Sequence, residues 1–216
     1  MRKLDRDTAP APICLSCYQH GKQNWGDLDP AHKQELRQCL EKMQGSRCAY
    51  CEGPLDDLGR HIEHFRQKHV FPTLTFDWRN LYWSCDQANS CGRHKDHDAG
   101  AYDPNDLIDP AQEDPDHFFR FRSDGTIHIR TADLSDKDRR RASETLRIFN
   151  LNPEHGRLRQ MRRRALEAYQ AQEPDILHAL EEFTPEERNA FISAELARTA
   201  SDPFSAVIRH FFEAVQ

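Results

Sequence analysis

The sequence has no long apolar run. None of its segments approaches the roughly 18 consecutive apolar residues that cross a bilayer, and its mean hydropathy is −0.89. The first fifteen residues also lack the apolar stretch of a secretory signal before their prolines. We therefore expect no membrane contact and a cytoplasmic location.

Disulfides are also not expected. The chain has seven cysteines, an odd number, and the cytoplasm keeps thiols reduced. Twelve histidines accompany them. This composition favours metal ligands over disulfide bonds.

Neither acidic nor basic residues are scarce, but the two kinds are segregated along the chain. The chain carries a net charge of −6, yet residues 118–165 contain thirteen lysines and arginines against six acids, whereas residues 166–216 contain three arginines against ten acids. A locally positive surface is enough to bind a nucleic-acid backbone. The candidates for this contact are Arg139, Arg140, Arg141, Arg162, Arg163 and Arg164. The alternative is a solvated helix face.

The punctuation of the chain predicts an α+β protein. Residues 1–46 read as an irregular arm followed by a helix that Asp29-Pro30 starts and Gly45 ends. Residues 47–110 hold two short strand-like pieces, Arg60–His64 and Asn80–Trp83, and a helix start is plausible from Asp86 onward. Residues 111–216 read as a hairpin followed mostly by helices. The helices are expected after Ser135, from Asn152-Pro153, after Thr184 and from about Pro203.

Four cysteines predict a structural zinc site. Cys48 and Cys51 form a CxxC pair, and Cys85 and Cys91 follow about 35 residues later. Four thiolates suit a closed tetrahedral zinc site. The alternative is four buried thiols. Cys14 and Cys17, with His20 and Cys39, allow a second metal, although here buried thiols are the better interpretation because no second pair matches the first.

The segment between the cysteine pairs carries the candidate catalytic residues. A neutral histidine can accept a proton near pH 7, so we assign His64 as the candidate general base. Glu63 and His61 share one face of the predicted strand, and His61 is placed to add a contact. Asn80 is expected to tie the loop that orients His64.

The order of these pieces resembles the ββα-metal fold of HNH nucleases: a strand with an acid–histidine pair, a loop, a strand with an asparagine, then a helix with a polar ligand. The resemblance implies a zinc-stapled HNH core with an N-terminal helical arm and a mostly helical C-terminal extension. It also implies that Glu63, with either Asn89 or His94, holds a catalytic divalent metal. Oxygen and amide ligands favour magnesium or manganese.

A closer resemblance covers residues 1–98. The motifs Arg2–Arg6, Cys48–Glu52, His61–Lys68, Leu74–Trp78 and Asn80–Cys85 are similar to those of the PtuB family of Septu-type and retron-linked bacterial defence loci. This similarity implies a nuclease effector that works with a partner ATPase of the ABC/SMC type in antiviral defence. The substrate is DNA, with structured RNA left open.

Two other interpretations remain open. In the first, the chain is a non-catalytic zinc-stabilised module that binds nucleic acid. In the second, it is an interaction protein whose acidic C-terminal helices dock a partner. Residues 175–216 combine acid with apolar helix positions and suit a protein better than a phosphate backbone. We expect this segment to be dispensable for the nuclease core.

Overall fold

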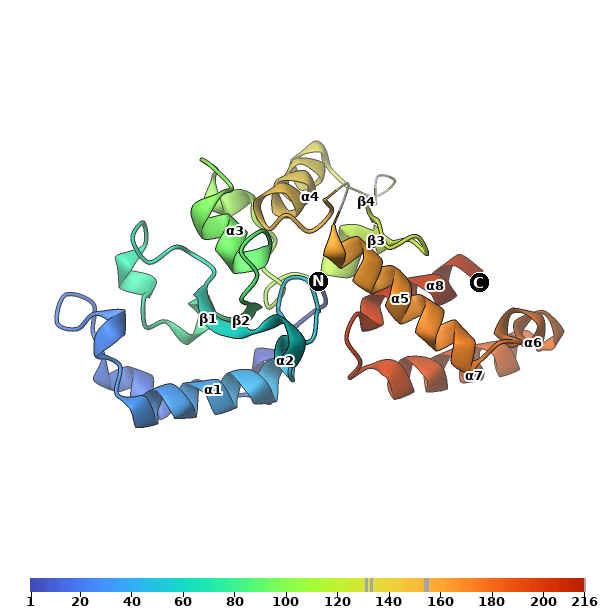
Figure 1. Cartoon of the computed structure of the whole chain (residues 1–216), viewed down its shortest axis with the longest axis horizontal. Coiled ribbons are helices and arrows are strands. Elements are labelled where there is room, and N and C mark those ends of the chain that lie inside the picture. The colour runs from blue at the N-terminus through green and yellow to red at the C-terminus, as the bar shows by residue number, and fades with distance from the viewer. Residues whose placement is uncertain (131, 133, 154–155, 216) are drawn as a thin grey trace.

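The computed structural model describes residues 1–215 except 131, 133, 154 and 155 (Figure 1). Its α-helices are α1 (Pro30–Gln44), α2 (Leu55–Leu58), α3 (Cys91–His97), α4 (Asp136–Ile148), α5 (Arg157–Gln172), α6 (Ile176–Glu182), α7 (Pro185–Thr199) and α8 (Ser205–Val215). Its strands are β1 (Arg60–His64), β2 (Leu81–Cys85), β3 (Phe119–Phe121) and β4 (Ile127–Ile129). Short 3-10 turns fill the arm and the loops. The predicted α+β class is confirmed.

Two separate antiparallel hairpins make up the strands. In the first, β1 pairs with β2 so that Glu63 lies opposite Tyr82 and His64 opposite Leu81. The helix α3 follows β2 and contacts it, which completes a β-β-α unit. The second hairpin, β3–β4, forms where Ser123-Asp124-Gly125 supplies the predicted turn.

The predicted helix starts are observed where a cap was present in the sequence. The Asp29 side chain accepts a hydrogen bond from the amide of Ala31, and Ser135 accepts one from Asp138. Thr184 and Glu187 form the predicted capping box of α7. Leu36 and Leu40 of α1 are fully buried, as the helical spacing indicated.

Other boundaries were wrong. The helix expected from Asp86 begins at Cys91, because residues 86–90 form a loop that carries the chain to Ser90, its N-cap. The second strand runs through Cys85, two residues beyond its predicted end. The start predicted for the next helix, Asn152-Pro153, precedes α5, whose first residue is Arg157; residues 154 and 155 lie outside the described residues.

The C-terminal helices pack against the cysteine-rich core. The amide of Ala206 donates to the Glu52 carboxylate at 3.2 Å, and the Arg47 guanidinium donates to the carbonyls of Ala200 and Asp202 at 2.8 and 3.1 Å. These contacts hold Arg47 and Glu52, the residues that flank Cys48 and Cys51. They bear on the prediction that residues 175–216 are dispensable for the core, which stays a prediction.

No helix among the described residues is both long enough and apolar enough to span a bilayer.

Candidate functional site

The four predicted zinc ligands come together in the interior. The Sγ atoms of Cys48, Cys51, Cys85 and Cys91 all lie within 4.8 Å of one another, and all four residues are buried. A tetrahedral zinc with Zn–S bonds of about 2.3 Å requires sulfur atoms roughly 3.8 Å apart, and the sulfurs of Cys51 and Cys85 are 4.0 Å apart. The donor set therefore fits a metal such as zinc.

Backbone amides support the sulfur atoms. The amide of Gly53 donates to the Cys51 sulfur at 3.4 Å, and the amide of Cys85 donates to the Cys48 sulfur at 3.3 Å. Two residues of the cluster region adopt positive φ angles, Glu52 at 65° and Cys91 at 55°. Such backbone strain is held only where surrounding contacts fix it, and here it turns the chain so that the thiols converge.

The other cysteines do not form a second cluster of this kind. Among the described residues, the four-cysteine group is the one set of three or more metal-ligating side chains within ligating distance. The buried Cys14 sulfur lies 3.6 Å from the carbonyl of His32, and burial raises the pKa of its thiol to about 11. This agrees with the interpretation of Cys14 as a buried thiol.

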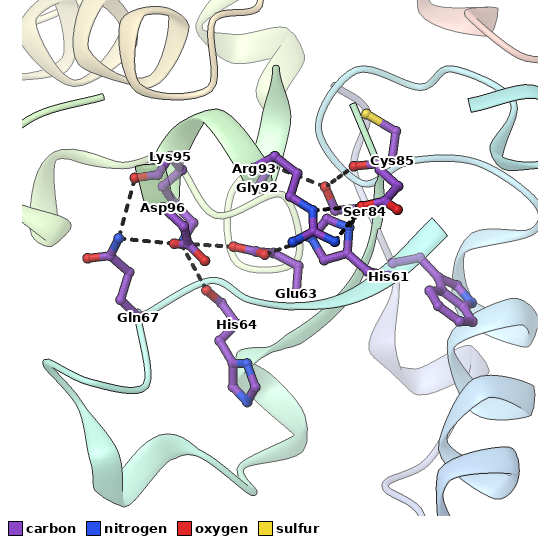
Figure 2. Close-up of polar contacts among 12 residues, drawn as sticks. His61, Glu63, His64, Gln67, Ser84, Cys85, Gly92, Arg93, Lys95 and Asp96 are labelled. Atoms are coloured by element: carbon purple, nitrogen blue, oxygen red, sulfur yellow. Dashed lines mark hydrogen bonds and ion pairs between the residues drawn. The ribbon is translucent and has the colours of Figure 1, made fainter. Parts of the chain in front are cut away.

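Glu63 is the buried carboxylate of the site. It is 2 % exposed and lies on the face of β1 toward α3 (Figure 2). The Nε2 atom of His61 is 3.1 Å from its Oε2 atom. The other ring nitrogen of His61 lies 3.6 Å from the carboxylate of Asp86, which Arg93 holds at 2.6 Å. A carboxylate and an imidazole thus face each other, with the second carboxylate behind the ring.

Lys95 neutralises this carboxylate from α3. Its Nζ atom is fully buried, 2.8 Å from Glu63 Oε1, and it donates to the His64 carbonyl at 3.1 Å. Burial lowers the pKa of Lys95, but the carboxylates of Glu63 and Asp96 outweigh it and hold the pKa above its ordinary value. The amine is therefore a fixed ammonium ion that orients Glu63 through one oxygen and leaves the other toward His61.

Gly92, in the first turn of α3, makes room for the carboxylate. A Cβ atom at this position would overlap Oε2 and Cδ of Glu63. The buried Glu63 cannot swing aside freely, because Lys95 and His61 hold it on both sides. The glycine therefore sets where the carboxylate lies.

We predict that Gly92→Ala displaces Glu63 and lowers any metal-dependent hydrolysis by about 10²-fold, since an error of about 1 Å in a catalytic group has an effect of this size. Zinc content should change little, and the free energy of unfolding should fall by about 1–3 kcal/mol, the usual cost of overpacking a buried site. The matched control is Gly26→Ala, where an added Cβ meets no atom within 4 Å. A wild-type rate for Gly92→Ala would show that the position of Glu63 is not critical.

His64 points away from Glu63, because successive side chains of a strand alternate (Figure 2). Its Nε2 atom is 3.0 Å from the carbonyl oxygen of Thr75, and Trp25 packs against its ring at a centroid distance of 4.5 Å. A carbonyl only accepts, so Nε2 carries the proton and Nδ1 has the free lone pair. Burial lowers the pKa of His64, so its ring is neutral near pH 7.

Asn80 spans the loop that supplies Thr75. Its side chain accepts from the amide of Arg66 at 2.6 Å and donates to the carbonyls of Arg66 and Leu74 at 3.0 and 3.1 Å. These bonds fix both ends of the loop between β1 and β2. The partner of the His64 ring is thereby held in place.

The two alternative last ligands lie away from the carboxylate. The His94 ring contacts the carbonyl of Ile148 in α4 at 2.9 Å. Asn89 is exposed in the loop before α3, where its carbonyl accepts from Asn150 at 2.8 Å. Neither side chain is hydrogen-bonded or ion-paired to Glu63 in the part of the chain that the structure describes. The side chain that does contact Glu63 in the described part of the chain, besides Lys95, is His61.

The predicted basic surface is divided by the structure. Arg162 is fully buried, stacks over Phe121 at 5.4 Å, and is not accessible to a phosphate. Arg139 and Arg140 pair with Asp136 and Asp106 at 2.5 and 2.8 Å, and Arg141 pairs with Glu113. The exposed members of the second triplet are Arg163, which pairs with Glu167, and Arg164.

Comparison with known proteins gives one informative match. No protein-family model matches the chain. Over 112 residues it is 31 % identical to the Septu protein PtuB of Bacillus thuringiensis, a match that covers 51 % of this chain. The chain is related to PtuB. The match covers 39 % of the length of PtuB, so what the whole of PtuB does is carried to this chain only as a proposal.

Sequence reasoning missed Lys95 and Gly92. Both lie in the segment after Cys91, but neither a lysine nor a glycine signals a metal site by its type. Their importance depends on the placement of α3 against β1, which the PtuB-like motifs do not specify. The buried Lys95 could have been suspected only from its position one helical turn after Cys91.

Proposed function

We propose that this chain is a metal-dependent HNH-type endonuclease that hydrolyses phosphodiester bonds in nucleic acid. The observation that carries the proposal is the β1–β2–α3 unit, in which Glu63 and His64 end one strand beside the four-cysteine cluster. The similarity to PtuB supports it.

His64 is the general base in this proposal. The carbonyl of Thr75 occupies Nε2–H and leaves Nδ1 to accept a proton from water. Trp25 and the Asn80-tied loop fix the ring, so its orientation is set before substrate arrives. The neutral ring that this role requires is the form favoured by burial.

Glu63 and His61 would hold the catalytic metal. A buried carboxylate oxygen and an imidazole nitrogen fit a magnesium or manganese ion that keeps several waters. When bound, such an ion would stabilise the charge that develops on the phosphate and the leaving oxygen. Asp86 orients the His61 ring from behind, and Lys95 orients Glu63 through the ion pair to its Oε1 atom.

The test is cleavage of plasmid DNA and of a structured RNA by the purified chain with Mg²⁺ or Mn²⁺, and with a chelator too weak to remove the structural zinc. Metal-dependent cleavage supports the proposal. Binding without cleavage under every metal condition would instead favour a zinc-stabilised binding module. The ion pair of Glu63 with Lys95, which already neutralises the carboxylate, is the observation in favour of that alternative.

The pH dependence of cleavage follows from His64. Burial lowers its pKa from about 6.5, so Nδ1 stays unprotonated to lower pH than in a free histidine. We predict that the acidic limb of the rate profile has its midpoint below pH 6.5. The stability that the neutral ring contributes is complete above the unfolded pKa and is lost as pH falls through the folded value. An acidic midpoint above pH 6.5 would contradict the assignment.

We propose in addition a defence role with a partner ATPase, which the similarity to the Septu protein PtuB supports. The acidic helices α6 and α7 are the proposed contact, since they expose Glu181, Glu186 and the apolar side chain of Leu177, which is 47 % exposed. Co-purification with a co-expressed ATPase of the ABC/SMC type should be lost in Glu181→Lys/Glu186→Lys. Retention at full stoichiometry would place the contact elsewhere.

A further inference from the structure

A groove lies between α1 and the β1–β2 hairpin, and it shares His61 with the residues that hold Glu63. It has a volume of about 640 Å³, within the range of sites that enclose small-molecule ligands. Figure 1 shows α1 running alongside the hairpin. The side chains that the argument uses are Trp25, Lys33, Arg37, Arg60, His61 and Trp83. We call it the α1–hairpin groove.

The groove is positively charged. Lys33 and Arg37 lie one helical turn apart on α1, and neither side chain has an ion-pair partner within the described ranges of the chain. Arg60 adds a third cation from β1. The one acid that lines the groove, Glu41, already pairs with Arg60 at 3.3 Å. Two cations are thus left for an anionic ligand.

Two tryptophans give the groove flat apolar walls. Trp83 is 4 % exposed, and its indole N–H has no hydrogen-bond acceptor among the described residues. A buried donor without a partner is uncommon in a native structure. This N–H lies behind the groove wall, and the Arg60 guanidinium lies over the Trp83 ring at 5.8 Å. Trp25, from the arm, offers the second ring.

The groove connects both halves of the candidate catalytic site. His61 lines it and contacts Glu63 at 3.1 Å on one face of β1. Trp25 also lines it and packs against His64, whose ring points to the other face. A ligand lying along the groove therefore contacts His61 directly and reaches Trp25, which packs against His64.

We propose that the α1–hairpin groove binds an unpaired nucleic-acid strand, with a base against Trp25 and phosphates against Lys33 and Arg37. The inference rests on the proposed nuclease function and names its substrate class. Base stacking on aromatic side chains needs a free base face, which a duplex covers with its neighbouring base pairs. The groove volume holds a nucleotide or two rather than a duplex. The substrate at this site is a single strand, a loop or a flap.

The experiment measures binding of a fluorescein-labelled dT12 strand and of the matched dA12–dT12 duplex by full-length protein, in zinc-containing buffer without Mg²⁺ or Mn²⁺. Wild type should bind the single strand at least tenfold more tightly. In Lys33→Glu/Arg37→Glu that affinity should fall at least tenfold, and the slope of log K against log salt should shrink by about 1.4, since each phosphate contact on a single strand contributes about 0.7.

The matched control is Lys42→Glu, on α1 outside the groove. It should bind the single strand nearly as tightly as wild type does. Any small loss of affinity from the change in net charge should be equal for the single strand and the duplex. Trp25→Ala should weaken single-strand binding and Trp25→Phe should restore it, since a phenyl ring still stacks. Zinc content and melting temperature confirm that each variant is folded.

Equal affinity for duplex and single strand, or loss of binding in Lys42→Glu equal to that in the groove variant, would overturn the proposal. Groove-dependent single-strand binding without cleavage under any metal condition would overturn the nuclease function and leave the groove supported. If the groove variants cleave at the wild-type rate, the nuclease function is supported and the proposal that the groove binds the substrate is overturned.

Discussion

His64→Gln is expected to lower phosphodiester cleavage by about 10²–10⁴-fold, the usual contribution of a general base. Glutamine keeps an amide N–H that can donate to the Thr75 carbonyl, as His64 Nε2 does at 3.0 Å. It lacks the basic lone pair of Nδ1. Initial rates on a nucleic-acid substrate in Mg²⁺ or Mn²⁺ measure the effect, and binding without divalent metal should remain close to wild type.

The control for this variant is His128→Gln, since His128 is exposed on β4. Its rate should equal that of wild type. Melting curves of both variants separate chemistry from folding. A His64→Gln protein that cleaves at the wild-type rate, or one that loses its folded structure, would show that His64 is a packing residue.

Removing the metal from the four-cysteine cluster is expected to unfold the core. The purified protein should contain one zinc per chain by elemental analysis, and structural zinc sites contribute apparent binding free energies of about 10–16 kcal/mol near pH 7. Cys48→Ser and Cys85→Ser each remove one thiolate from a site whose sulfurs lie within 4.8 Å of one another. Their melting transitions should broaden and fall, as should that of wild type with a strong chelator.

Cys17→Ser is the matched control, because Cys17 is an exposed cysteine outside the cluster. It should keep its zinc and its melting temperature. Active, fully folded protein without zinc would contradict the assignment, and so would a Cys48→Ser variant that melts like wild type.

The features that the sequence predicted are those that depend on residue type and on spacing along the chain. The CxxC pair and its distant partners identified the four cysteines, and the capping residues Asp29, Ser135 and Thr184 located helix starts. Motifs of this kind can be recognised from residue type and spacing, so they do not require knowledge of the fold. The strand of Arg60–His64 was also placed correctly.

The environment of Glu63 depends on packing between distant segments. The sequence does not show that Lys95 enters from α3, that Gly92 leaves space for the carboxylate, or that Trp25 of the arm reaches His64. The burial of Arg162 in the basic stretch likewise depends on packing that the sequence does not show. A helix turns 100° per residue, so the three consecutive arginines of α5 point in three directions. The one that faces inward, Arg162, is buried.

The contacts of Arg47 and Glu52 with residues 200–206 bear on how zinc is gained and lost. They join positions 153 to 155 residues apart, and closing so long a loop is a slow, non-local event in folding. We expect the thiols to meet zinc before this closure and the C-terminal helices to cover the ion afterwards. Exchange of bound zinc would then be gated by undocking of those helices, so that the lifetime of the ion reports the local stability of α8.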